Sequence, residues 1–235
     1  MKNSKTYLVM ALAAGMFAFT SCKKGCTDSE AVNYDESVKE KRDDGSCVYG
    51  PTIELNGDAT VEVALGGTYN DAGATATNRD GSTVEVTTDL SDVDTGTIGT
   101  YTVTYFAENE NATVSATRTV EVKFMQSNYL GDWTTTSDCG TTFPVADATI
   151  NAGATSNAIE LDGFFTLVGG TATANIAGST ITVPNQTISI TGGDVTFSGT
   201  GTMAADGMSF TINYTYDNQV PFIGGQGTCT ATYTK

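Results

Sequence analysis

Much of this chain alternates apolar and polar residues with a period of two. The clearest runs span 60–65, 99–106 and 113–124, where valine, alanine and tyrosine alternate with threonine, glutamate and lysine. Since successive side chains of a strand point to opposite faces, this pattern predicts strands with one buried face. Turn residues separate the runs, as in Asn-Gly-Asp at 56–58 and Asp-Gly at 80–81. With no long helical pattern between them, the chain is predicted to be all-β.

The first β domain is expected over residues 51–124. The sequence PTIELNGDATVEVALGGTYNDAGATATNRDG, followed by VDTGTIGTYTVTYFAENENATVSATRTVEV, resembles the bacterial Ig-like domains repeated in cell-surface and secreted proteins. The residues that carry the resemblance are Leu55-Asn56-Gly57, Tyr69, Asp71, Gly73-Ala74, Asp80-Gly81, Gly99-Thr100-Tyr101 and Arg118-Thr119-Val120. The resemblance implies a β-sandwich that acts as a spacer or adhesion module and has no catalytic residues.

A second antiparallel β domain is expected over residues 125–235, either a barrel or a sandwich. Its candidate strands are short and end at turn residues; they span 131–137, 146–150, 158–161, 164–168, 171–176, 180–183, 186–190, 194–199, 208–216 and 228–233. The runs YLGDW at 129–133 and ITVPNQTI at 181–188, with the closing GTCTATYTK, give a looser resemblance to lipocalin-like domains of Bacteroidota lipoproteins.

Residues 1–21 have the parts of an export signal. Two lysines precede an apolar run at 8–19 that is shorter than the roughly 20 residues of a membrane span. The sequence Phe-Thr-Ser-Cys at 19–22 resembles a bacterial lipobox, which implies that Cys22 becomes the lipidated first residue. An ordinary signal peptide with a free Cys22 is the alternative. The lysines at 23 and 24 favour the periplasmic face of the outer membrane over the cell surface, where acidic residues are usual.

The chain has five cysteines, and lipidation of Cys22 leaves four for two disulfides in an oxidising compartment. We predict that Cys139 bridges Cys229, because both lie near opposite ends of the second domain on strand positions that match core residues. We predict that Cys26 bridges Cys47 within a small unit over residues 22–50. A bond from Cys26 or Cys47 to a distal cysteine is the competing arrangement.

The small unit itself resembles a short cysteine-bounded repeat of secreted and surface proteins. The resemblance rests on the sequence GCTD at 25–28, the residues AVNY at 31–34 and the closing DDGSC at 43–47. Its carboxylates, Asp28, Asp35, Asp43 and Asp44, are of the type that binds Ca²⁺, but Asp-Gly and Asp-Ser sequences are also ordinary turn chemistry. We favour turns, and no metal site or cofactor is predicted.

Histidine is absent, which excludes Ser-His-Asp and Cys-His catalysis and imidazole metal ligands. Carboxylate pairs for glycoside hydrolysis are not marked either, because the acidic residues of the second domain are expected mostly at turns. Aromatic residues remain as candidates for a ligand pocket or a sugar platform, although a barrel core is favoured for each. They are Trp133, Phe164, Phe165, Phe197, Phe210, Tyr214, Tyr216 and Phe222.

The function predicted is that of a membrane-anchored envelope lipoprotein with a non-enzymatic binding or structural role. Its partners are the membrane, through the lipid anchor, and a glycan or protein held by the distal domain. The net charge of −16 argues against nucleic acid. Two alternatives remain open: a barrel that carries a small apolar ligand, and a carbohydrate-binding accessory protein. The location predicted is the outer membrane, on its periplasmic face or at the cell surface.

Overall fold

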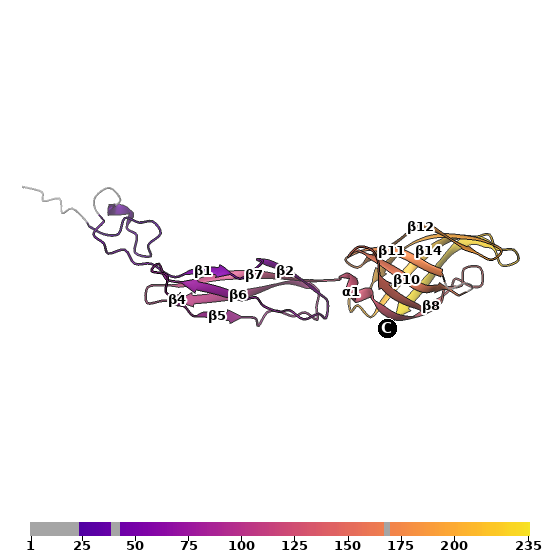
Figure 1. Cartoon of the computed structure of the whole chain (residues 1–235), viewed down its shortest axis with the longest axis horizontal. Coiled ribbons are helices and arrows are strands. Elements are labelled where there is room, and N and C mark those ends of the chain that lie inside the picture. The colour runs from indigo at the N-terminus through magenta and orange to yellow at the C-terminus, as the bar shows by residue number, and fades with distance from the viewer. Residues whose placement is uncertain (1–23, 39–42, 167–169) are drawn as a thin grey trace, which may run out of the picture.

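The computed structural model describes residues 24–38, 43–166 and 170–235. The predicted signal peptide and lipidation site at Cys22 lie outside these residues. Within them the chain is all-β, as predicted: the helices are a 3-10 turn, η1 (Glu36–Val38), and one α-helical turn, α1 (Gln126–Tyr129). No helix among the described residues has the length and apolar character needed to cross a membrane. Figure 1 shows three parts in a row: the small N-terminal unit, a sandwich and a barrel.

The sandwich contains seven strands in two sheets. One sheet has the order β1-β3-β4 and the other the order β2-β7-β6-β5, with β2 parallel to β7 and the remaining pairs antiparallel. The strands are β1 (Thr52–Leu55), β2 (Thr60–Ala64), β3 (Ala74–Thr77), β4 (Thr83–Val84), β5 (Val86–Asp89), β6 (Gly99–Glu108) and β7 (Thr113–Lys123). Alternate residues of β6 and β7 face inward, so Val103, Tyr105, Val120 and Val122 are buried.

The second domain is a closed barrel of eight strands. The strands are β8 (Gly131–Ser137), β9 (Ala148–Ala152), β10 (Ala158–Phe165), β11 (Gly170–Ala177), β12 (Thr180–Ile190), β13 (Gly193–Met203), β14 (Ser209–Asn218) and β15 (Gly225–Thr234). Each strand pairs antiparallel with the next in sequence, and β15 returns to pair with β8. Because the sheet is closed, none of the described strands of this domain is an edge strand.

Two of the predicted strand breaks were wrong, and eight strands replace the ten expected. Residues 158–161 and 164–165 belong to the single strand β10, whose register shifts around Gly163, a residue with φ 74°. Residues 180–183 and 186–190 form β12, which continues through an irregularity at Pro184. In a sequence, glycine and proline predict the end of a strand. Within a barrel they also occur at bulges, where a strand bends and continues.

The barrel interior combines a cluster of aromatic side chains with aliphatic ones. Trp133 packs edge-on against Phe210 at 4.7 Å between ring centroids, and Phe210 stacks on Tyr233 at 4.5 Å. On β13, Gly199 faces this interior opposite Tyr214, and a Cβ at this position would lie 2.9 Å from the tyrosine ring. The absence of a side chain there makes room for the ring, which is one reason why so many aromatics fit in eight strands.

The sandwich and the barrel are joined through α1. The Asn128 side chain donates a hydrogen bond to the carbonyl oxygen of Leu65 at 2.8 Å, while the backbone oxygen of Asn128 accepts one from Lys235 at 3.0 Å. The Gln126 side chain donates to the carbonyl oxygen of Thr155 in the β9–β10 turn at 2.9 Å. Both domains therefore contact the connecting residues directly, and the joint is bonded on each side.

Candidate functional site

The end of the barrel that faces away from the sandwich is closed by a loop that the sequence did not single out. This loop, residues 138–147, connects β8 to β9 and places Phe143 inside the barrel, where the ring is completely buried. Phe143 stacks on Tyr216 at 4.8 Å with an interplanar angle of 7°, and contacts Phe164 and Phe197 at 5.8 and 5.6 Å. The aromatic ring acts as a plug at this end.

Asn218 holds the plug in place. It is one of two buried polar or charged residues among those described, with 2% of its surface exposed. Its side-chain nitrogen donates to the carbonyl oxygen of Thr142 at 2.6 Å, next to Phe143, and its oxygen accepts from the Val220 N–H at 2.9 Å. Because both ends of the amide are hydrogen-bonded, its burial carries no unsatisfied group.

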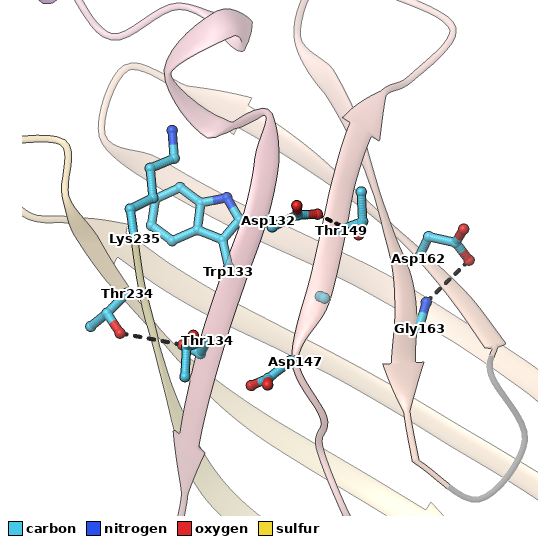
Figure 2. A pocket seen from close by; sticks show the side chains of 10 residues that line it. Asp132, Trp133, Thr134, Asp147, Thr149, Asp162, Gly163, Thr234 and Lys235 are labelled. Atoms are coloured by element: carbon cyan, nitrogen blue, oxygen red, sulfur yellow. Dashed lines mark hydrogen bonds between the residues drawn. The ribbon is translucent and has the colours of Figure 1, made fainter.

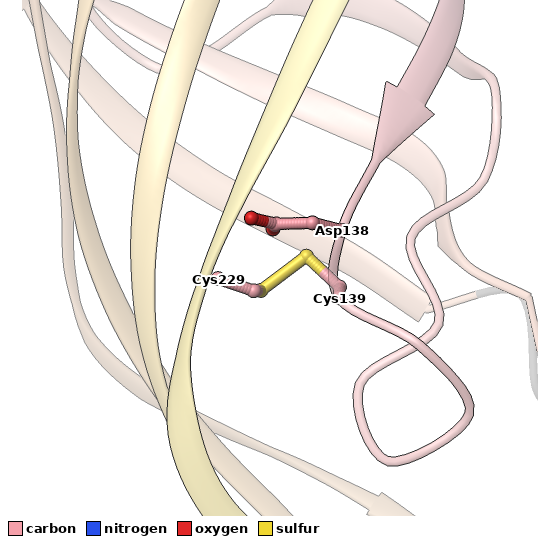
Figure 3. A group of neighbouring side chains, drawn as sticks. All are labelled: Asp138, Cys139 and Cys229. Carbon is pink, nitrogen blue, oxygen red and sulfur yellow. A yellow bond between two sulfur atoms is a disulfide. The ribbon is translucent and has the colours of Figure 1, made fainter.

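A disulfide anchors the same loop. Cys139 is bonded to Cys229, as Figure 3 shows, and Cys26 is bonded to Cys47 in the small unit. The predicted reason for the first pairing was partly wrong: β8 ends at Ser137, so Cys139 lies in the loop and not on the strand face of Trp133. The loop instead brings Cys139 back over β15, where the Asp138 N–H donates to the Thr230 carbonyl oxygen at 3.1 Å.

Among the described residues, the group with the spacing of metal ligands is Asp138, Cys139 and Cys229. Its two sulfur atoms are bonded to each other and offer no thiolate, and the Asp138 carboxylate accepts a hydrogen bond from the Thr230 N–H. The arrangement is a disulfide beside a turn. In the small unit, Asp28, Asp35, Asp43 and Asp44 each accept a backbone N–H two residues ahead, which is the turn geometry we favoured.

The predicted aromatic candidates divide into two groups. Six of them are buried in the barrel core: Trp133, Phe164, Phe165, Phe197, Phe210 and Tyr214. Tyr216 is half-buried under the plug, and Phe222 is fully exposed in the loop between β14 and β15. Phe106 of the sandwich is the other large exposed aromatic in the described chain, so no pair of neighbouring exposed rings forms a sugar platform.

A shallow groove of about 530 Å³ crosses the outer face of β8, β9 and β10. Figure 2 shows three carboxylates along the groove: Asp132 on β8, Asp147 directly before β9, and Asp162 on β10. Each carboxylate accepts a hydrogen bond: Asp132 from the Thr149 hydroxyl at 2.7 Å, Asp147 from the Thr135 N–H at 2.6 Å, and Asp162 from the Gly163 N–H at 3.1 Å. The groove is polar, acidic and internally hydrogen-bonded.

The prediction that the acidic residues of this domain lie mostly at turns was wrong. Asp132, Glu160, Asp162, Asp194 and Asp217 all lie within strands. All five point away from the interior, where a barrel strand exposes every second side chain to water. Outward strand positions are exposed to water and can therefore also hold acidic residues, which adds to the charged surface of the barrel.

The small unit is docked on the near end of the sandwich through Tyr49. The Tyr49 hydroxyl donates to the Asp28 carboxylate at 2.7 Å, and the Arg79 guanidinium lies over the Tyr49 ring at 3.8 Å. Asn109 and Asn111 donate side-chain hydrogen bonds to the Tyr49 carbonyl oxygen at 3.0 and 3.1 Å. Hydrogen bonds from the Glu30 N–H and Tyr49 lower the pKa of Asp28, which keeps it charged beside Arg79. This joint, like that at α1, is bonded from both sides.

Inside the sandwich, Arg118 organises a polar network. Its side chain is 1% exposed and donates to the Asp71 carboxylate at 2.5 Å and to the Tyr105 hydroxyl at 2.7 Å. Two backbone carbonyl oxygens, those of Asn56 and Asp58, accept further hydrogen bonds at 2.6 and 2.9 Å. The network ties the loop after β1 to the core of the sandwich, which is a structural role.

Comparison with known proteins identifies the sandwich. Residues 53–122 match the family model described as Bacterial surface protein, Ig-like domain, which confirms the resemblance seen in the sequence. A search of curated proteins finds no match. Among solved structures, the lipoprotein BT2262 from Bacteroides thetaiotaomicron aligns at 18% identity over 79% of this chain and 100% of that chain, with a TM-score of 0.28.

Proposed function

We propose that this chain is a lipid-anchored envelope protein in which the small unit and the Ig-like sandwich form a stiff arm that carries the barrel. The role is non-enzymatic and consists of structural support and presentation of the distal barrel end. The matched Ig-like domain is of the bacterial surface-protein type, and the leader with Cys22 supplies the anchor. The bonded joints at Tyr49 and α1 are the observation that carries the proposal, because a loose chain of domains would not need them.

The two alternative functions have less physical support. A carried apolar ligand needs an open cavity, but here rings fill the barrel core and Phe143 plugs one end. A glycan platform needs neighbouring exposed aromatics, and the described chain exposes Phe106 and Phe222 on different domains. A glycan held through the acidic groove of β8–β10 would lack a stacking ring, because the Trp133 ring there is 1% exposed.

Small-angle X-ray scattering of the mature chain carrying Cys22→Ser tests the stiff arm. The maximum dimension should correspond to three parts in a row, and the double variant Tyr49→Ala/Asn128→Ala should broaden the distance distribution. Asn151→Ala, on the exposed face of β9, is the matched control and should leave the profile unchanged. A wild-type profile that already requires a wide ensemble of bent shapes contradicts the proposal.

The anchor is tested separately in cells. Cys22→Ser should move the protein from the detergent phase of a membrane preparation to the aqueous phase, or leave it unprocessed. Unchanged partitioning of that variant contradicts the lipidation of Cys22, and it leaves the arm itself to the scattering experiment.

A further inference from the structure

The loop between β14 and β15 carries four consecutive apolar residues, Val220-Pro221-Phe222-Ile223. We name residues 220–223 the apolar tip. Phe222 has a relative exposure of 106%, Pro221 is exposed, and the other two are half-buried. No charged residue occurs between Asp217 and Lys235, in a chain whose net charge is −16. The tip is therefore an uncharged apolar point on an acidic protein.

The apolar tip lies at the end of the barrel opposite the sandwich. The turn that begins β14 touches the sandwich, because a Cβ on Gly207 would lie 3.3 Å from the Leu65 side chain and 3.4 Å from Phe124. From there β14 runs for ten residues before the tip, which at about 3.3 Å per residue spans roughly 30 Å. In Figure 1 the β14–β15 loop is at the far end of the barrel from α1.

The backbone projects the tip outward. Phe222 has a φ of 72°, and it is the single non-glycine residue with a positive φ in the described chain. The base of the loop is fixed: the Gln219 N–H donates to the Asp194 carbonyl oxygen at 2.9 Å, and the Val220 N–H donates to Asn218 at 2.9 Å. A positive φ at a phenylalanine and an exposed phenyl ring are both unfavourable in the free protein. Asparagine at this position would lower both costs, because it is polar and adopts a positive φ more readily.

We infer that the apolar tip inserts into the interface of a phospholipid bilayer. A protein partner or a second copy would need about 800 Å² of matching surface per side for a stable interface, far more than one four-residue loop presents. A bilayer accepts a narrow apolar wedge of any shape. Because anionic headgroups repel an acidic protein, the membrane that suits this tip is a zwitterionic one.

The inference depends on the barrel alone and does not require the anchor at Cys22. The tip points away from the sandwich and the N-terminal unit, so the bilayer in question is one that faces the distal end of the molecule. Binding to that bilayer would let the stiff arm connect two surfaces. Only this connection rests on the proposed function; the insertion of the tip does not. Failure of tip insertion leaves the scattering and anchoring experiments unaffected.

Vesicle flotation tests the inference with a defined probe. The mature chain carrying Cys22→Ser, which removes the acyl anchor, is mixed with phosphatidylcholine vesicles and centrifuged through a density gradient. We expect the protein to float, and the further change Phe222→Asn to reduce the floating fraction by on the order of tenfold. Asparagine tolerates a positive φ, so this variant should melt at the same temperature as its parent or higher. Phe106→Asn, on the exposed face of the sandwich, is the matched control and should still float.

A second readout places the ring in the lipid. Trp133 is the single tryptophan and is buried, so brominated phosphatidylcholine should leave its fluorescence unchanged. A Phe222→Trp variant should gain a component that brominated lipid quenches. Three results would each overturn the inference: a parent protein that stays at the bottom of the gradient, a Phe222→Asn variant that floats equally well, or an unquenched Phe222→Trp.

Discussion

The sandwich and the barrel are both β domains of alternating sequence, yet they fill their interiors with different chemistry. The sandwich packs mostly valine and alanine, with Tyr105, around a buried ionic network at Arg118, and it contains no cysteine. The barrel packs aromatic rings together with aliphatic residues. Among its described residues Asn218 is the buried polar one, and the Cys139–Cys229 bond ties the distal loop to β15. The sandwich fixes the loop after β1 by hydrogen bonds from one buried cation, whereas the barrel fixes its distal loop by a disulfide, a neutral buried amide and ring packing.

The chain carries its own reporter for this comparison. Trp133 is the single tryptophan and lies in the barrel core, so tryptophan fluorescence follows barrel unfolding alone. Far-ultraviolet circular dichroism follows both domains. A variant that acts in one domain should therefore move the two signals differently, and each prediction below uses that separation.

The largest effect is expected from opening the barrel. Replacement of Cys139 and Cys229 by serine removes a cross-link across 90 residues and should destabilise the barrel by about 4 to 5 kcal/mol in the chain-entropy model. The urea midpoint measured by Trp133 fluorescence should fall, while the sandwich transition stays in place. Serine at Cys26 and Cys47, which closes 21 residues, is the matched control and should not move the fluorescence signal. A shift of both transitions together would show that the domains unfold as one.

Next in size is the removal of the charge inside the sandwich. Arg118→Met keeps the bulk of the side chain but removes the positive charge that pairs with Asp71 and the donor to the carbonyl oxygens of Asn56 and Asp58, which should cost about 3 to 5 kcal/mol. The loss should appear in circular dichroism and not in Trp133 fluorescence. Arg79→Met, at the exposed joint with Tyr49, provides an arginine control outside the core. An Arg118→Met variant as stable as wild type would mean that the network adds no stability.

A smaller loss is expected from the plug. Phe143→Ala deletes a ring that contacts several other rings and should destabilise the barrel by about 3 kcal/mol, the lower end of the range for such changes, because the loop has room to relax. Trp133 fluorescence should report the change. The same variant opens the distal end, so it should also begin to bind a hydrophobic dye such as anilinonaphthalene sulfonate in the native state. A stable Phe143→Ala barrel without dye binding would contradict the plug.

The sequence predicted the elements better than it predicted the contacts between them. Period-two alternation located the long strands, because a half-buried strand must alternate. The bridge from Cys139 to Cys229 was predicted from position and parity, although Cys139 lies just beyond the strand. Phe143 was missed because a loop residue has no periodicity, and its burial depends on a disulfide four residues earlier and on Asn218, 75 residues later.

The joints were missed for a related reason. Tyr49, Arg79 and Asn128 are polar or aromatic residues in turns and linkers, where a sequence alone gives no sign of a partner. Their role follows from packing between units that are separate in the sequence. At Gly163 and Pro184 the sequence predicted too much: it indicated strand breaks that do not occur. Closure of the barrel keeps a bent strand paired on both sides, so the strand continues.

The smallest predicted effect is a difference between the two domains in how their stability depends on pH. Burial raises the pKa of Asp71, but hydrogen bonds from Tyr105, Tyr69, the Gly73 N–H and Arg118 outweigh it and hold the pKa below its ordinary value of 3.8. A carboxylate whose pKa is lower in the folded state stabilises the fold fully above the unfolded-state pKa, and that stability is lost as the pH falls through the folded-state value.

The sandwich should therefore become less stable below about pH 4. In this range the Asp71 carboxyl is protonated in the unfolded chain but stays ionised in the folded one. Circular dichroism melts between pH 6 and pH 2.5 should show its transition moving to lower temperature, and Asp71→Asn should be less stable at pH 6 but flatter across the series. Because the described core of the barrel buries no charged side chain, Trp133 fluorescence should lose less than the sandwich signal over the same range. If acid shifts the fluorescence transition by as much as the sandwich transition, the ionic network is not what distinguishes the two domains.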